Sequence, residues 1–222
     1  MLKKKKKIIK NMQVQGMLTP LFFNKDQQNI ILGLCLGGIK IKKVKNNYIL
    51  DIKRKNKEYI FNMFNIFNDY IIEKPKEIII KNKSSNWFIR ISSNELRSYI
   101  DLFNFSGSYK IPNNIKNLLN PAVLTHWFMT HDFTNKKFYS FGIWKFNIDD
   151  FNILNDIIHN LYNVKFQIIK NQVIVNIESV INFKEFIQYE MFSCMSYKLT
   201  SLSSSYVIKN LDLNEKLKIE LN

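Results

Sequence analysis

Apolar positions recur along the chain with two periods, one typical of helices and one typical of strands, and the same order of segments occurs twice. Helical segments carry apolar residues at a spacing of 3.6, whereas strands alternate apolar and polar positions. In the first half the pattern predicts helices over 26–37, 59–71 and 94–105 and strands over 39–42, 48–54, 77–81 and 87–92. In the second half it predicts helices over 122–129, 151–161 and 181–190 and strands over 138–145, 164–170 and 173–177. Both halves are therefore interpreted as αββαββα repeats.

A short motif precedes the first helix of each half. Leu18-Thr19-Pro20 recurs as Leu119-Asn120-Pro121, and a proline suits the start of a helix. Between the halves, residues 110–120 have the composition of a linker. These boundaries predict a basic N-terminal arm over 1–17, a first repeat over 18–109, a linker over 110–120, a second repeat over 121–199 and a C-terminal tail over 200–222.

The charge of the chain favours a polyanionic partner. Its 33 Lys and Arg exceed its 18 Asp and Glu, which gives a net charge of +15. Such an excess repels itself in the compact state and is typical of proteins that bind polyanions. The basic residues are spread along the chain rather than gathered on one amphipathic helix, which favours a nucleic acid over a membrane surface. No apolar run approaches the ~20 residues that span a bilayer, so we expect no membrane partner.

The remaining composition indicates where the protein acts. Cys35 and Cys194 lie in apolar stretches without metal-ligand spacing, as buried thiols in a reducing compartment do. Abundant Lys, Asn, Ile and Phe with few Gly and Pro indicate an AT-rich gene. We therefore expect an organelle-encoded protein of the mitochondrial matrix.

Three segments resemble the LAGLIDADG homing endonuclease and maturase family in its single-chain form with two repeats. Residues 29–38, which contain Gly33 and Gly37, resemble the first LAGLIDADG helix. Residues 113–132 resemble the second such helix and its lead-in. Residues 189–199, which end in Met-Ser-Tyr-Lys-Leu, resemble the closing segment of the second repeat. The similarity covers residues 18–199 in order.

The resemblance implies an α+β fold of two pseudo-symmetric αββαββα repeats, which form a saddle-shaped pair of antiparallel sheets with nucleic acid on the open face. It also implies that the two LAGLIDADG helices pack against each other at the pseudo-twofold axis. Close approach needs small residues four apart, and an isolated glycine inside a helix otherwise costs ~1 kcal/mol. Gly33 and Gly37 meet this need.

In the family each of these helices ends in an acidic residue, and the two carboxylates hold divalent cations for phosphodiester cleavage. The corresponding residues here are Gly38, which has no ligand atom, and His131, whose imidazole suits Mg²⁺ poorly. Asp132 follows His131 but lacks an acidic partner, and the histidines form no recognisable triad with a Ser or Cys. We therefore expect no catalytic residue, no metal site and no cofactor, and we interpret the chain as a degenerate endonuclease that is not an enzyme.

The period of two in the strands predicts which side chains face a nucleic acid. Lys40 and Lys42 are expected to point away from the core, as are Phe88 and Arg90, with Trp87 on the opposite side. We expect the binding residues to be the basic residues on the arm, on the strands and at the strand ends. They are Lys3, Lys4, Lys5, Lys6, Lys7, Lys40, Lys42, Lys43, Lys45, Lys53, Arg54, Lys81, Lys83, Arg90, Lys136, Lys137, Lys145, Lys165 and Lys170.

The function that follows from this reading is RNA binding. Few outward strand positions carry short side chains suited to bidentate base recognition, which favours reading of RNA shape. We expect a structural, rRNA-binding component of a ribonucleoprotein, the mitochondrial ribosome above all, with neighbouring ribonucleoprotein proteins as further partners and no small-molecule substrate. The alternatives are a group I intron maturase, which binds intron RNA, and an active homing DNA endonuclease.

Overall fold

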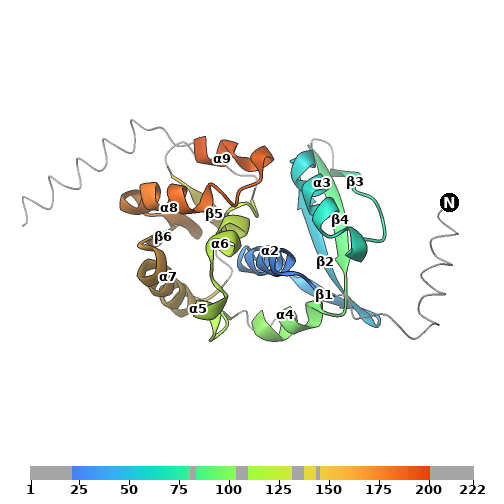
Figure 1. Ribbon diagram of the computed structural model, residues 1–222, viewed down its shortest axis with the longest axis horizontal. Helices are drawn as coiled ribbons and strands as arrows, with labels where there is room; N and C mark the ends of the chain where they lie inside the picture. Colours follow the sequence, from blue (N-terminus) through green and yellow to red (C-terminus); the bar gives the residue numbers. More distant parts are fainter. Residues whose placement is uncertain (1–21, 81–83, 104–109, 132–137, 144–145, 201–222) are drawn as a thin grey trace, which may run out of the picture.

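The computed structural model describes residues 22–80, 84–103, 110–131, 138–143 and 146–200. Two sheets, each with its own helices, flank a central pair of helices (Figure 1). The labels of Figure 1 are used from here on. Among the described helices, none has the length and apolar character needed to cross a membrane.

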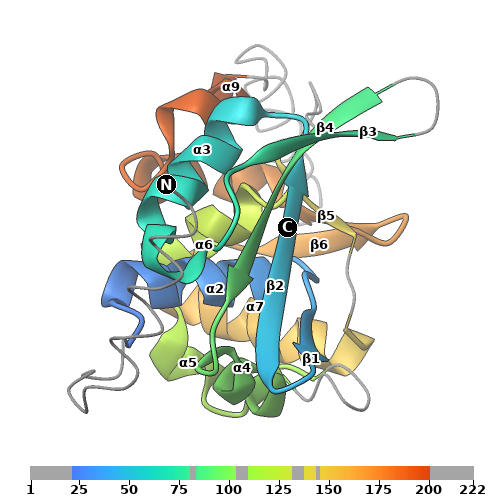
Figure 2. The same cartoon turned by 90° about the vertical axis from the view of Figure 1, so that its right-hand side faces the viewer.

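The first half contains a four-stranded antiparallel sheet in the order β1-β2-β4-β3. Its elements are α2 (Lys25–Leu36), β1 (Ile41–Val44), β2 (Asn47–Arg54), α3 (Lys57–Ile66), the 3-10 turn η1 (Asn68–Tyr70), β3 (Lys76–Ile80), β4 (Ser84–Ser92) and α4 (Leu96–Phe103). Helices α3 and α4 pack on one face of the sheet. Figure 2 shows the strands from the side, with these helices to their left and no described helix on the opposite side of the sheet.

The second half repeats the order of elements around a smaller described sheet, β5-β7-β6. Its elements are α5 (Ile115–Leu118), α6 (Pro121–Phe128), β5 (Ser140–Ile143), α7 (Ile148–Tyr162), β6 (Phe166–Ile169), β7 (Gln172–Val175), η2 (Ile177–Ser179), α8 (Val180–Ile187), η3 (Ser193–Met195) and α9 (Tyr197–Thr200). Of the predicted strand over 138–145, residues 140–143 form β5 and pair with β7, and residues 144–145 lie outside the described residues.

Polar side chains fix where the helices begin. The Asn24 side chain accepts from the backbone N–H of Gln27, whose own side chain accepts from the N–H of Asn24, and this capping box starts α2. Asn120 starts α6 in the same manner, since its Oδ1 accepts from the N–H of Val123. α6 then follows with Pro121 in its first turn, as the sequence predicts.

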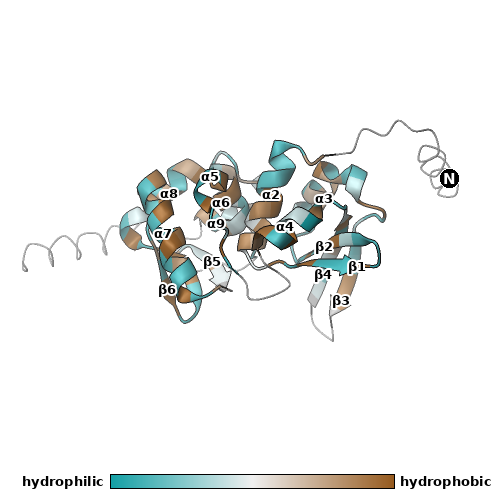
Figure 3. Ribbon diagram, turned by 90° about the horizontal axis from the view of Figure 1, so that it is seen from below, coloured by the Kyte–Doolittle hydropathy of each residue, from teal (hydrophilic) through white to brown (hydrophobic). Residues whose placement is uncertain are grey.

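One continuous core joins the halves, and its two ends differ in chemistry. The first half buries mainly aliphatic side chains such as Ile31, Leu50 and Ile89. The second half buries an aromatic cluster around Phe141, whose ring contacts those of Trp127, Phe128, Phe166 and Phe183. In Figure 3 apolar and polar residues alternate around α3, α7 and α8, as expected for helices with one face on this core.

The architecture confirms the predicted α+β class with antiparallel sheets. Short α5 lies inside the predicted linker and is anchored by Ile111, Ile115 and Leu119, which are all buried. The boundaries assigned to the arm, repeats, linker and tail stay predictions.

Candidate nucleic-acid interface

The central helices α2 and α6 touch through glycine. A Cβ at Gly33 would lie 2.7 Å from the backbone oxygen of Val123 and 2.8 Å from the backbone nitrogen of Trp127. A Cβ at Gly37 would lie 2.4 Å from the Thr130 side chain. No side chain fits in either gap, because real Cβ atoms do not approach other heavy atoms so closely. The predicted packing reason for both glycines is therefore confirmed.

The C-terminal end of α2 is closed by its own backbone. Gly38 has a φ of +80°, in the left-handed region that glycine adopts without steric cost. The N–H of Gly38 donates to the Cys35 carbonyl, and the N–H of Ile39 donates to the Leu34 carbonyl. This arrangement is a glycine cap that satisfies the last carbonyls of a helix. Gly38, at the position where the resemblance implies a carboxylate, therefore ends α2.

The C-terminal end of α6 is closed by a side chain from far along the sequence. The Lys198 ammonium donates to the carbonyl oxygens of Phe128 and His131, the latter at 2.7 Å, and lies 4.3 Å from the centre of the Phe128 ring. Lys198 is only 2% exposed. The His131 ring packs on β5, where a Cβ at Gly142 would lie 2.2 Å from its Cδ2 atom. Gly142 has a φ of +88°, so both its backbone and its missing side chain suit this contact.

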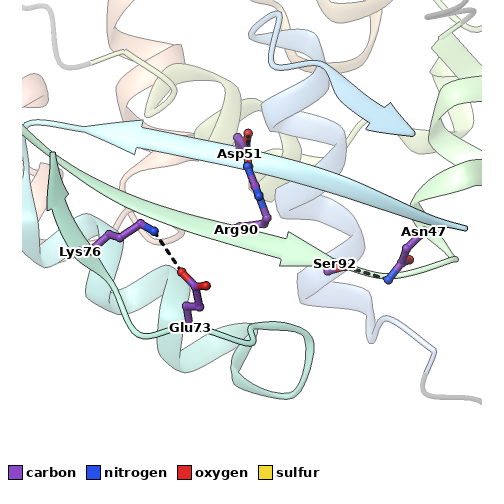
Figure 4. A network of polar contacts seen from close by, with 6 residues as sticks. All are labelled: Asn47, Asp51, Glu73, Lys76, Arg90 and Ser92. Carbon is purple, nitrogen blue, oxygen red and sulfur yellow. Dashed lines mark hydrogen bonds and ion pairs between the residues drawn. The ribbon is translucent and has the colours of Figure 1, made fainter. Parts of the chain in front are cut away.

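The open face of the four-stranded sheet is polar and basic. Strand register places Asp51 opposite Arg90 and Lys53 opposite Phe88 on this face, while Leu50 and Ile52 point to the core. Arg90 donates to both carboxylate oxygens of Asp51, at 2.7 and 3.1 Å, and this hydrogen bond raises the pKa of the guanidinium above its ordinary value. Figure 4 shows the pair standing on neighbouring strands.

Further cations gather around one aromatic ring on the same face. The Phe88 ring centre lies 5.8 Å from Lys53 Nζ, 5.6 Å from Lys76 Nζ and 5.7 Å from Arg90 Cζ. Lys76 also pairs with Glu73 at 3.0 Å, and that contact lowers the pKa of the exposed Glu73 carboxyl (Figure 4). A face with several ammonium and guanidinium groups around a ring suits a phosphate backbone.

The structure places the predicted binding residues in three groups. Lys40, Lys42, Lys53 and Arg90 are exposed, and the register of β1, β2 and β4 puts the last three on the open face. Exposed Lys43 lies on β1 and exposed Lys45 in the β1–β2 turn, exposed Lys165 and Lys170 flank β6, and Arg54 approaches the Tyr59 ring on the core side. The rest lie outside the described residues: Lys3, Lys4, Lys5, Lys6, Lys7, Lys81, Lys83, Lys136, Lys137 and Lys145.

The family model of the LAGLIDADG DNA endonucleases matches residues 28–185. This chain belongs to the LAGLIDADG DNA endonuclease family. It is 27% identical over 114 residues to the probable intron-encoded endonuclease 1 of Wickerhamomyces canadensis, a match that spans 48% of this chain and 49% of that protein. The chain thus spans about half the length of that curated relative.

Solved structures agree with this assignment of the fold. The homing endonuclease I-WcaI bound to its DNA recognition sequence superposes with a TM-score of 0.69, at 21% identity, over 84% of this chain and 96% of that one. A structure of I-DmoI in complex with DNA and Ca matches with a TM-score of 0.46, at 20% identity, over 72% of this chain and 87% of that one.

These findings correct the functional predictions. The family is described as DNA endonucleases, the curated relative is named as an endonuclease, and I-WcaI was solved bound to its DNA recognition sequence. The predictions of an RNA partner, of a ribosomal or ribonucleoprotein role and of a chain that is not an enzyme are therefore wrong. The net charge predicted a nucleic acid, but phosphates of RNA and of DNA attract lysine equally, and the expected scarcity of base-reading side chains did not identify RNA. The argument for catalytic loss failed because it rested on two positions alone.

The ends of α2 and α6 are the positions at which the family implies bound divalent cations. Gly38 offers no ligand atom, and His131 offers nitrogen where hard divalent cations prefer oxygen. Within the described ranges, no group of three or more His, Cys, Asp or Glu side chains could hold a metal ion. Asp132 lies outside the described residues. Gly38 and His131 therefore do not fit a divalent cation site.

Sequence reasoning missed four residues of this LAGLIDADG chain. Asp51 and Lys76 are absent from the predicted binding set, and Phe88 is predicted to point away from the core without a binding role; strand register places all three on the open face. That the outward strand positions carry few short side chains suited to base recognition stays a prediction. Lys198 was quoted in a motif without a role, and its burial depends on carbonyls about seventy residues away in the sequence, at 67 and 70 positions.

Of the two cysteines predicted to be buried, Cys35 is buried and Cys194 is only partly so, and His126 lies in the core. His126 lies beside Gly33 and contacts the Phe192 ring edge-on at 5.3 Å. Burial lowers the pKa of His126 to about 4. Cys35 is fully buried, and burial raises the pKa of its thiol far above the ordinary value, whereas Cys194 is partly exposed. None of these three groups faces the open sheet.

Proposed function

We propose that this chain is a DNA-binding endonuclease that places the open face of its four-stranded sheet in the major groove of duplex DNA. The observation that carries the proposal is the placement of Lys42, Lys53, Lys76 and Arg90 on one uncovered face of antiparallel strands. The major groove of B-form DNA is ~12 Å wide and admits a β-ribbon. The net charge of +15 supports strong, salt-sensitive binding.

The shape of the face favours DNA over double-stranded RNA. The major groove of A-form RNA is deep and narrow, so strands and their side chains do not reach its base edges. The eight residues of β2 and nine of β4 form a long two-stranded core of the sheet that suits the wider DNA groove. The support from relatives points the same way, because I-WcaI was solved bound to its DNA recognition sequence.

The reaction we propose is hydrolysis of the DNA backbone, and it rests on the family description and on the names of the relatives. Because Gly38 and His131 do not fit a cation, we assign no catalytic step to them. Asp132, which follows α6 in the sequence, is the acidic residue to be tested. A mitochondrial location, proposed from composition, accords with this function.

The test combines selection and cleavage. Purified full-length protein is incubated with a random-sequence duplex DNA library and Mg²⁺ or Mn²⁺, and both bound duplexes and newly formed ends are sequenced. We expect one enriched sequence and ends at a fixed place within it, with ends lost in Asp132→Asn and binding retained. Equal binding of duplex RNA, or no enriched DNA sequence, would overturn the proposal.

A further inference from the structure

Asp51 and Arg90 form a bidentate ion pair on the open face. They are register partners on β2 and β4, the two central strands of the sheet. The Arg90 side chain is 52% exposed and that of Asp51 only 19% exposed. The Asp51 carboxylate is therefore the more buried partner, and the Arg90 side chain is the more exposed one, on the face where DNA is proposed to bind.

The hydrogen bonds use one edge of the guanidinium and leave another open. Nε donates to Asp51 Oδ1 and Nη2 donates to Oδ2, so this edge is fully engaged. An arginine has five N–H donors, so two remain on Nη1 and one on Nη2. Two of these, one on each Nη, form the terminal fork of the side chain, which presents two parallel N–H groups.

A fork of two N–H donors matches one base in the major groove. Guanine presents two acceptors there, O6 and N7, and bidentate contact from arginine is the commonest specific contact to a base. Adenine places a donor at the equivalent position of O6, and thymine and cytosine offer no such pair of acceptors. The chemistry of the open edge therefore selects guanine.

We propose that Arg90 reads a guanine in the DNA target and that Asp51 is a positioning residue that holds its guanidinium for this contact. This inference rests on the proposed function. Asp51 fixes the plane of the guanidinium from one side, and the Phe88 ring lies 5.7 Å from Cζ on the same face. A side chain held in place before binding loses less conformational freedom on contact with the base.

A role in stability alone accounts for the Asp51–Arg90 pair less well than a role in positioning Arg90. Exposed ion pairs stabilise folded proteins little, and the core face of the same strands is already packed with Leu50, Ile52, Ile89 and Ile91. Asp51 also places a negative charge on a surface that otherwise gathers cations, which would weaken phosphate binding. Bidentate pairing with Arg90 neutralises that charge, and the carboxylate then orients the guanidinium.

The experiment determines the DNA preference at every position of the selected site for wild type and variants. For wild type we expect one position at which replacing guanine by any other base weakens binding roughly tenfold to a hundredfold. In Arg90→Ala this ratio should fall to about one while other positions keep their preferences. Arg90→Lys should not restore it, because an ammonium lacks the planar fork.

Asp51→Asn separates positioning from charge. Removing the carboxylate should leave binding to sites without that guanine unchanged or tighter, while the guanine preference falls several-fold. Arg97→Ala is the matched control, since Arg97 is an exposed arginine that pairs with Asp101 at 4.0 Å on α4, and it should leave every preference unchanged. Circular dichroism and thermal unfolding confirm that each variant is folded.

Each outcome has a separate meaning. If wild type selects a DNA site and Arg90→Ala keeps all its base preferences, the inference is overturned and the proposed function stands. If Asp51→Asn keeps the full guanine preference, the positioning role is overturned. If wild type selects no DNA sequence, both the proposed function and the inference fail.

Discussion

The two central helices occupy matching places in the two halves but end in different ways. α2 ends with Gly38 in the left-handed region and needs only its own backbone to close its last turn. α6 ends against the buried ammonium of Lys198, which reaches it from the other end of the second half. The contrast teaches that a repeated backbone does not imply repeated chemistry, so each half has to be interpreted from its own residues.

The two sheets also differ in the side chains that they present on their open faces. The first presents Lys42, Lys53, Lys76 and Arg90 on its open face. The described strands of the second present amides, Gln167 and Gln172, with Lys165 and Lys170 at the ends of β6. We therefore expect the first sheet to supply most of the electrostatic affinity for DNA.

The largest expected effect concerns the lysine that closes α6. Lys198→Met keeps the length of the side chain but leaves two buried carbonyls without their donor, so we expect a loss of about 3 kcal/mol in the free energy of unfolding. Urea unfolding measures it. Lys184→Met, at an exposed position on α8, is the control and should change stability by less than about 0.5 kcal/mol. An unchanged Lys198→Met variant would contradict the role of this contact.

The next effect depends on pH and concerns His126 at the contact between the halves. Its folded pKa of about 4 lies below the ordinary 6.5, so the neutral form is favoured in the folded state. The stability that this group contributes is present above pH 6.5 and is lost as the pH falls towards 4. We expect a loss of about 2 kcal/mol between pH 7 and pH 5. Chemical unfolding of wild type and His126→Gln should show this loss in wild type only, beyond what other groups contribute to both.

A smaller effect tests the glycine contact. Gly37→Ala should lower the free energy of unfolding by about 1–2 kcal/mol, because the new methyl group meets Thr130. Combining it with Thr130→Ala should recover part of the loss, by about 0.5 kcal/mol or more in a double-mutant cycle. If the stability losses of the two single variants simply add, the new methyl group at residue 37 does not clash with Thr130.

The smallest effect tests the second sheet. Replacing Lys165 and Lys170 by Ala should lower the slope of log affinity for DNA against log salt concentration. Two lost phosphate contacts would lower this slope by about 2, and we expect a smaller change. Fluorescence anisotropy at several salt concentrations measures the slope. A reduction larger than that caused by three substitutions on the first sheet would reverse the comparison between the sheets.

The backbone was largely predictable, whereas the site was not. Helices such as α3 and α7 follow from the 3.6 period, and the close approach of α2 and α6 follows from Gly33 and Gly37. Lys198 and Asp51 could not be found in the same way, because a buried lysine and an acid on a basic face depend on partners distant in sequence. The choice of DNA over RNA was missed because net charge does not distinguish the two, and the expected scarcity of short base-reading side chains pointed to RNA instead.

The central claim is that the open face of the first sheet binds duplex DNA. The most direct test measures the salt dependence of affinity for the selected duplex in wild type and in a variant with Lys42, Lys53 and Lys76 replaced by Ala. We predict that the slope of log affinity against log salt concentration falls by about 2 to 3, since each lost phosphate contact removes ~0.9. An unchanged slope, with the variant folded, would show that DNA binds elsewhere on the molecule.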